Sequence, residues 1–277
     1  MTEAQKSDLP TRFAAGVVMA AVAFAAAYFG GWPFRILAAL AAGVMLLEWC
    51  DMHGLPRRWA LIGGALVALV LLGGIEYFYP DPGFAPTDDG GEIDVEDFQP
   101  ALAAFALIAA AGAVLALASR RVILGWGFIY IGIPTFSLLL LSWTFGGLVF
   151  WVLAVTIATD VLAYFAGRSI GGPKLAPKIS PNKTWAGLAG GVIGGALAGY
   201  GIFWLFDVGA PFHWLGAPMA VVAQAGDLYE SWEKRRAGIK DSGSLLPGHG
   251  GVLDRLDGML AVSLVTALLL IAGFWTE

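Results

Sequence analysis

Nine apolar segments, each about 17 to 20 residues long, take up most of this 277-residue chain. A helix needs about 20 residues to cross a hydrocarbon layer of about 30 Å, and lipid offers no partner to an unpaired peptide group. The pattern therefore predicts an all-α, polytopic integral membrane protein with about nine transmembrane helices. The predicted spans are 13–30, 33–50, 59–75, 100–117, 122–141, 147–166, 188–206, 214–231 and 258–275.

The composition excludes the main alternatives to a membrane protein. Hydrophobic residues make up 58% of the chain and charged residues only 13%. In a soluble domain about a quarter of the residues are charged. A single cysteine, Cys50, allows neither an internal disulfide nor a thiolate zinc cluster. No internal repeat or long linker divides the chain, so we expect one integral membrane domain over residues 1–277.

The basic residues predict which ends of the spans face the cytoplasm, because short loops rich in Lys and Arg stay inside. A cytoplasmic amino terminus places fifteen of the sixteen basic residues inside and leaves only Arg35 outside. The loop 76–98 carries eight acidic residues and no base, so we expect it to face outward. The inner bases are Lys6, Arg12, Arg57, Arg58, Arg120, Arg121, Arg168, Lys174, Lys178, Lys183, Lys234, Arg235, Arg236, Lys240 and Arg255.

The first of two informative inner segments, 167–187, holds four bases, no acid, three prolines and four glycines. Its prolines disfavour a regular helix. Lys178, Lys183, Ser180 and Thr184 could donate hydrogen bonds to phosphate oxygens. A loop that only sets the membrane topology accounts for the charge equally well.

The second inner segment, 226–258, mixes bases with carboxylates, glycines and a histidine, which a purely topological loop would not need. Asp227 and Ser231 are four residues apart on one face of the eighth span, and Asp254 and Asp257 are three apart at the start of the ninth. Carboxylate and hydroxyl oxygens are ligands that Mg²⁺ prefers, often together with substrate phosphates. Asp254 could instead cap the ninth helix, with Asp257 complementing its dipole.

These residues resemble the carboxyl-terminal signature of the phosphatidate cytidylyltransferases, also called CDP-diacylglycerol synthases. That signature contains a serine, Lys-Arg, Lys-Asp, Pro-x-His-Gly-Gly and Asp-Arg-x-Asp in this order. Segments 163–168, 180–184 and 226–228 are also similar to family segments, so the resemblance covers about residues 160–259. In this sequence the signature residues are Ser231, Lys234, Arg235, Lys240, Asp241, Pro247, His249, Gly250, Gly251, Asp254, Arg255 and Asp257.

The resemblance implies a magnesium-dependent transfer of the cytidylyl group from CTP to phosphatidic acid, at the cytoplasmic face of the cell membrane, giving CDP-diacylglycerol and pyrophosphate. It also implies a homodimer among membrane lipids with no nucleic acid partner, and it leaves open a second, monovalent cation. The expected metal ligands are Asp227, Ser231 and Asp254, and the other expected catalytic residues are Asp257 and His249. The expected substrate-binding residues are Lys178, Ser180, Lys183, Thr184, Lys234, Arg235, Lys240 and Arg255.

The chain departs from the family pattern at three positions. Ala186 stands where an acid is usual, Glu233 where an apolar residue is usual, and Val161 where a polar residue is common. None of these changes removes a signature carboxylate. On sequence alone two other functions stay open: a polytopic transporter of a phosphorylated solute, and a CTP-dependent lipid or polyprenol kinase. A CDP-alcohol phosphotransferase is disfavoured because the spaced aspartates of that class are not apparent in the sequence.

Overall fold

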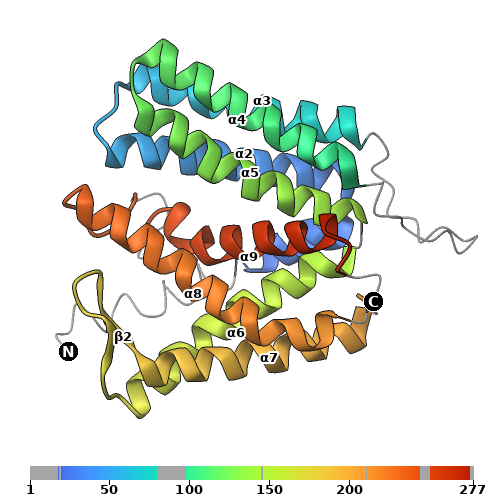
Figure 1. The fold of residues 1–277 in the computed structure, drawn as a ribbon, viewed down its shortest axis with the longest axis vertical. Helices are drawn as coiled ribbons and strands as arrows, with labels where there is room; N and C mark the ends of the chain where they lie inside the picture. The colour runs from blue at the N-terminus through green and yellow to red at the C-terminus, as the bar shows by residue number, and fades with distance from the viewer. Residues whose placement is uncertain are drawn as a thin grey trace, which may run out of the picture.

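The computed structural model describes residues 18, 20–79, 98–144, 146–206, 208–209, 211–243 and 250–274. Within these residues a helix lies over each of the nine predicted spans (Figure 1). A short hairpin of two strands lies between the sixth and seventh helices. The elements are the helix Ala20–Phe29, α2 (Gly31–Met52), α3 (Arg57–Phe78), α4 (Gln99–Ser119), α5 (Val122–Thr144), α6 (Gly146–Ser169), β1 (Lys174–Ala176), β2 (Ser180–Thr184), α7 (Trp185–Phe206), α8 (Phe212–Arg236) and α9 (Leu253–Ile271).

Turn residues explain where several helices begin and end. Gly30 adopts a φ of 57° before α2, and Gly54 adopts a φ of 62° between α2 and α3. Only glycine reaches such positive φ values without steric cost. α8 continues past the predicted span end at residue 231, because its polar last turns are stabilised by the i,i+4 pair of Glu230 and Lys234.

The basic segment between α6 and α7 forms an antiparallel hairpin. Lys174 of β1 lies opposite Thr184 of β2, and Ala176 lies opposite Ser180. The absence of a regular helix around the prolines is therefore confirmed. The strands themselves were not predicted, since proline cannot donate to a ladder of backbone hydrogen bonds. Apart from this hairpin, the described regular structure is α-helical, as expected.

Small residues allow α6, α7 and α8 to approach one another closely. A Cβ atom on Gly194 of α7 would lie 2.6 Å from the carbonyl oxygen of Ala158 on α6. A Cβ atom on Gly195 would lie 2.7 Å from the carbonyl oxygen of Gly216 on α8. Contacts between small residues are typical of membrane helices, because lipid supplies no hydrophobic force that would press the helices together.

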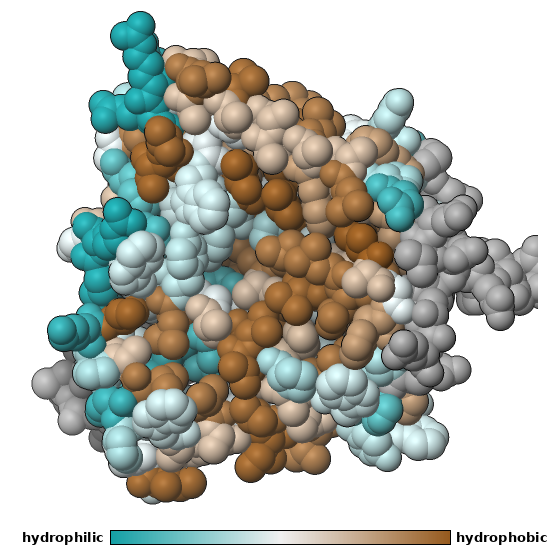
Figure 2. All heavy atoms as spheres, in the orientation of Figure 1, coloured by the Kyte–Doolittle hydropathy of each residue, from teal (hydrophilic) through white to brown (hydrophobic). Residues whose placement is uncertain are grey.

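Six of the described helices, α2 to α7, are long and apolar enough to cross a membrane. α8 and α9 are not among them; α8 is less apolar on average than the six and carries charged side chains in its last turns. On the visible face, hydrophobic residues extend across the middle of the molecule (Figure 2). Hydrophilic residues gather at the left edge, where the end of α8 and the hairpin lie in Figure 1. These features are those of a membrane protein with several spans.

Loops that were predicted to share the inner side lie together at one end of the bundle. Arg235 at the end of α8 donates its Nε–H to a carbonyl oxygen in the hairpin turn at 3.2 Å. His53, in the turn between α2 and α3, has its Nε2 atom 3.5 Å from Oε2 of Glu233 on α8. Arg35, the one base predicted on the other side, is buried and pairs with Glu76 at 2.9 Å. The predicted separation of bases between the two ends therefore agrees with the fold.

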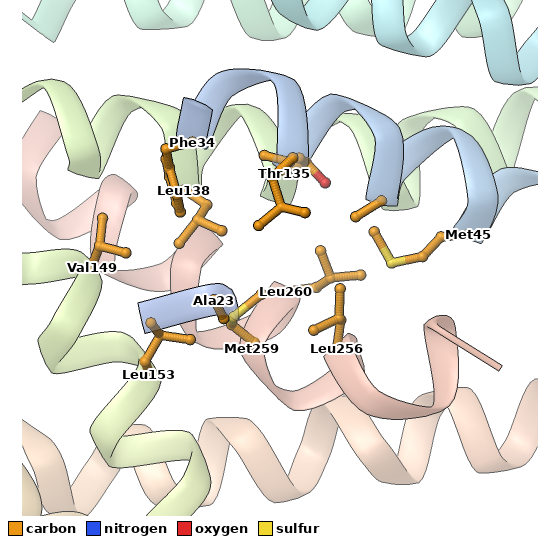
Figure 3. Close-up of a pocket in the computed structure, with 13 residues that line it drawn as sticks. Ala23, Phe34, Met45, Thr135, Leu138, Val149, Leu153, Leu256, Met259 and Leu260 are labelled. Carbon is orange, nitrogen blue, oxygen red and sulfur yellow. The ribbon is translucent and has the colours of Figure 1, made fainter. Parts of the chain in front are cut away.

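An apolar cavity of about 100 Å³ lies between α2, α5, α6, α9 and the helix that precedes α2 (Figure 3). Its lining is apolar except for Thr135, whose hydroxyl already donates to a carbonyl of its own helix at 2.7 Å. α9 turns Leu256, Met259 and Leu260 toward this cavity. The charged side of α9 instead contacts α8, where the candidate site is built.

Candidate active site

Asp227 is the centre of a first charge cluster, between α8 and the hairpin. Its Oδ2 atom lies 2.6 Å from Nζ of Lys183 on β2, and its Oδ1 atom accepts a hydrogen bond from the Ser231 hydroxyl at 3.2 Å. Lys183 also lies 3.5 Å from the carbonyl oxygen of Gln224. The spacing in sequence correctly placed Asp227 and Ser231 side by side. The Asp227 side chain keeps 32% of its surface exposed, so a ligand can reach it.

Lys234 is the centre of a second charge cluster, which joins α8 to the start of α9. Its Nζ atom lies 2.5 Å from a carboxylate oxygen of Glu230 and 2.5 Å from Oδ1 of Asp254. The other oxygen of Asp254 accepts the backbone N–H groups of Ser242 and Gly251 at 2.9 and 2.8 Å. Both oxygens of Asp254, a predicted metal ligand, are therefore engaged by donors of the protein itself.

The pairing moves the pKa values of Lys234 and Asp254, which lie outside the predicted spans 214–231 and 258–275. Burial alone would lower the pKa of Lys234, but the charge of Glu230 and the hydrogen bond to Asp254 raise it above its ordinary value. Burial alone would raise the pKa of Asp254, but Lys234 and the N–H of Gly251 hold it below its ordinary value. Both groups are therefore charged near neutral pH.

Two further aspartates lie near Asp227. Burial raises the pKa of Asp257 well above its ordinary value, and the charge of Asp227 raises it further. Asp257, near the start of α9, is 9% exposed and lies within electrostatic range of Asp227 and Asp160. Asp160, in the second half of α6, accepts a hydrogen bond from the side-chain amide of Gln224 at 3.4 Å. Carboxylates from α6, α8 and α9 thus gather in one region. Like charges that are held close together favour the binding of a cation between them.

The donor set fits a metal ion that is shared with a phosphate. In the described part of the chain, no group of three or more His, Cys, Asp or Glu side chains is placed to hold a metal by itself. Asp227 and Ser231 nevertheless offer two hard oxygen ligands at an accessible position. Mg²⁺ commonly binds through one or two carboxylates together with substrate phosphates and water. The residues therefore fit such an ion, but not an ion enclosed by protein ligands alone.

The predicted phosphate-binding bases fall into two groups. Lys178, Lys240 and Arg255 are exposed at this end of the molecule. Lys183 and Lys234 are paired with carboxylates, as described above. Arg235 belongs with the bases that are engaged within the protein, since it donates to the carbonyl oxygens of Ile179 and Ile239.

The predicted hydroxyl donors have different surroundings. Thr184 is buried, and its Oγ1 atom accepts the N–H of Gly187 at 3.0 Å, so it caps the start of α7. Ser180 is half-buried at the beginning of β2. Ser180 is therefore the more accessible of the two hydroxyls. His249, predicted to lie near the pyrophosphate or nucleotide, is outside the described residues.

Glu233, one of the departures from the family pattern, is buried and has polar neighbours. Tyr229 donates its hydroxyl to Glu233 Oε1 at 3.3 Å, and Arg236 lies 3.5 Å from the same oxygen. His53 approaches the other oxygen from the turn between α2 and α3. These partners explain how this chain accommodates an acid there. Of the other departures, Val161 is exposed and Ala186 is half-buried.

Some site residues were not singled out from the sequence. Glu230 could have been found from its i,i+4 spacing to Lys234 and its i,i+3 spacing to Asp227. Gln224 lies one helical turn before Asp227, but an amide in an apolar span carries no distinctive signal. Glu48 stands in an apolar helix, and its contacts lie far away along the chain, so local sequence gives no sign of its role.

Comparison with known proteins identifies the family. The sequence profile of the cytidylyltransferase family matches residues 10–272, which is most of the chain. The chain belongs to this family. The cytidylyltransferase resemblance inferred from the motifs is thus confirmed, and it extends well beyond the segment 160–259 that carries those motifs.

Individual cytidylyltransferases show the same relationship. A phosphatidate cytidylyltransferase of Brucella abortus is 35% identical over 288 residues, covering 96% of this chain and 94% of the relative. One from Helicobacter pylori is 44% identical over 157 residues, covering 54% of this chain and 58% of the relative. One from Pseudomonas aeruginosa is 42% identical over 133 residues, covering 47% of this chain and 49% of the relative.

Proposed function

We propose that this chain is a phosphatidate cytidylyltransferase, an enzyme that transfers the cytidylyl group of CTP to phosphatidic acid. The observation that carries the proposal is the similarity to the Brucella abortus enzyme, which spans nearly the whole of both chains. The charge clusters support it, because they unite the signature residues of α8 and α9 at one end of an apolar bundle.

The reaction needs alignment and charge neutralisation more than proton transfer. A phosphate oxygen of phosphatidic acid attacks the α-phosphorus of CTP, and the bond to the departing pyrophosphate breaks. Because the attacking oxygen is already anionic, no strong general base is required. Catalysis then depends on holding two anions in line and on stabilising the charge of the leaving group. The bases Lys178, Lys183, Lys240 and Arg255 are our candidates for the phosphate contacts.

We assign a Mg²⁺ ion to Asp227 and Ser231, next to the carboxyl group of Asp257. Bound there, the ion would neutralise phosphate charge and polarise the α-phosphoryl group. Lys183 would then exchange its carboxylate partner for a substrate phosphate. The proposed ligand set also includes Asp254, whose coordination requires Lys234 to release one carboxylate oxygen. The hard oxygen donors and the surplus of negative charge in this region support the assignment.

We further propose a multi-pass protein of the cell membrane with nine spans, a cytoplasmic amino terminus and a site that faces the cytoplasm. The grouping of basic loops at the end of the bundle that carries the site supports this orientation. The substrates support it too, because a water-soluble nucleotide and a lipid headgroup meet only at the membrane surface. A homodimer is proposed from the family resemblance, and light scattering of the purified protein in detergent tests it.

A purified-protein assay tests the proposed function. Each of the four nucleoside triphosphates is offered with and without phosphatidic acid and Mg²⁺, and pyrophosphate release is measured. We expect release from CTP only when both phosphatidic acid and Mg²⁺ are present, with a lipid product that carries the cytidine diphosphate group by mass spectrometry. A product that gained only a phosphate would indicate a kinase instead. Uptake of a phosphorylated solute into vesicles without turnover would indicate a transporter.

A further inference from the structure

Glu48 on α2 caps the start of α9 from a distance of about 200 positions along the chain. Its Oε1 atom accepts the N–H of Val252 at 2.8 Å, and its Oε2 atom accepts the N–H of Leu253 at 2.8 Å. The first N–H groups of a helix have no partner within it. α9 has no side-chain cap from its own N-cap residue, Val252. A buried carboxylate from another helix supplies the missing acceptors and complements the helix dipole.

The same carboxylate is joined to Asp254 through Ser242. The hydroxyl of Ser242 donates to Glu48 Oε2 at 3.2 Å, while its backbone N–H donates to Asp254 Oδ2 at 2.9 Å. Asp254 Oδ2 also accepts the N–H of Gly251, one residue before the segment that Glu48 holds. Glu48 and Asp254 therefore both accept hydrogen bonds from Ser242 and from the segment 251–253. A shift of one carboxylate would displace groups that hold the other.

Glycines make room for these carboxylates. A Cβ atom on Gly251 would lie 2.5 Å from Glu48 Oε2, and a Cβ atom on Gly243 would lie 2.8 Å from Glu48 Oε1. Gly250 has a φ of 82°, and a Cβ atom there would lie 2.5 Å from Asp254 Oδ2. The glycine pair at 250–251 thus fits a close approach of carboxylates to the backbone.

We infer that Glu48 is a positioning residue, which fixes the first turn of α9 and thereby sets where Asp254 meets Lys234. The inference rests on the proposed cytidylyltransferase function. Both oxygens of Glu48 accept hydrogen bonds from N–H or O–H groups of the protein, so in this arrangement its role is to hold these groups in place. It acts on the reaction through Asp254, whose displacement by about 1 Å could cost about 100-fold in rate.

The variant Glu48→Gln tests this role with little change in shape. Its amide nitrogen would face a backbone N–H where a carboxylate oxygen now accepts. We expect kcat to fall by about 10- to 100-fold, the range found for residues that orient ligands of a site, while KM for CTP changes little and the yield of folded protein is retained. Hydrogen exchange of the peptide 250–257 should become faster. Asp51→Asn is the matched control, because Asp51 lies on the same helix in an exposed pair with Arg57, and both measurements should stay at the parent values.

The outcomes separate this inference from the proposed function. Faster exchange in Glu48→Gln with an unchanged kcat would show a cap that only supports the fold, and it would overturn the positioning role. Absence of turnover in the parent protein would refute the proposed function, and the positioning role with it, whatever the exchange data show. Should Glu48→Gln fail to fold, Ser242→Ala removes only the hydroxyl contact to Glu48. A several-fold drop of its kcat would support the inference, and an unchanged kcat would refute it.

Discussion

Replacing Lys234 by methionine should destabilise the protein by about 3 to 5 kcal/mol, because it removes one partner of a buried ion pair and leaves the other charge uncompensated. The side chains of Lys234, Glu230 and Asp254 are 11%, 0% and 6% exposed. Asp254 would keep its two backbone N–H donors. Glu230 has no such backbone donors among the described residues. Most of the cost therefore comes from Glu230 wherever the pH is high enough to ionise its carboxyl group.

Equilibrium unfolding in mixed detergent micelles measures this cost. The double variant Lys234→Met, Glu230→Met should recover much of the lost free energy of unfolding, because replacing both members of a buried pair by apolar residues is often neutral or stabilising. Arg57→Met is the matched control. Its pair with Asp51 is exposed on both sides, so its loss should cost no more than about 1 kcal/mol.

The reasoning would be refuted if Lys234→Met unfolded within about 1 kcal/mol of the parent protein, like an exposed pair. It would also be refuted if the double variant were no more stable than Lys234→Met. A further check is the pH dependence of the deficit. Protonation relieves an unpaired buried carboxylate, so the difference between Lys234→Met and the parent should shrink as the pH is lowered.

Three other predictions concern the site. Asp227→Asn should lower CTP-dependent turnover by about 100-fold or more through loss of charge stabilisation, with unchanged elution on size exclusion; near-normal turnover would contradict the metal assignment. Gly251→Ala should cost about 1 to 3 kcal/mol by overpacking against a carboxylate, seen as a lower melting temperature, whereas Gly201→Ala, with open space around it, should not destabilise. Because the pKa of Asp254 is lowered, its ionised form stabilises the fold above the ordinary Asp value of about 3.9, and this stabilisation is lost as pH falls through the lowered pKa. Because the pKa of Lys234 is raised, its charged form stabilises the fold below about 10.4, and this stabilisation is lost as pH rises through the raised pKa. A melting temperature that does not change toward either extreme of pH would argue against the pair.

The helices of this protein could be predicted because a bilayer fixes their length and composition. Nine apolar segments in the sequence correspond to nine helices in the described residues. The end of a helix was harder to predict where an apolar span continues into a charged segment. α8 continues to Arg236, past the predicted end at 231, since its polar turns find partners on α9 and in the turn between α2 and α3.

Within the site, contacts between residues close in sequence could be predicted, and contacts between residues far apart in sequence could not. The spacing of Asp227 and Ser231 places them on one helix face, and the structure joins them by a hydrogen bond. The ion pair of Lys234 and Asp254 was not predicted, since several bases lie at that end of the bundle and the sequence does not show which of them pairs with Asp254. The structure shows that Thr184 caps α7, and nothing in the local sequence separates this use of its hydroxyl from the expected contact with phosphate.

Sequence alone determined that the chain is a helical membrane protein with a cytidylyltransferase signature, because span length and motif spacing are local properties. Tertiary structure decided which carboxylates hold bases, which hold backbone donors and which remain accessible. Glu48 shows the difference most clearly. Its partners lie 194 to 205 positions away, and they meet it only because the packing of the helices brings α2 to the start of α9. Hydrogen bonds of about 3 Å depend on that packing, and no local pattern in the sequence encodes it.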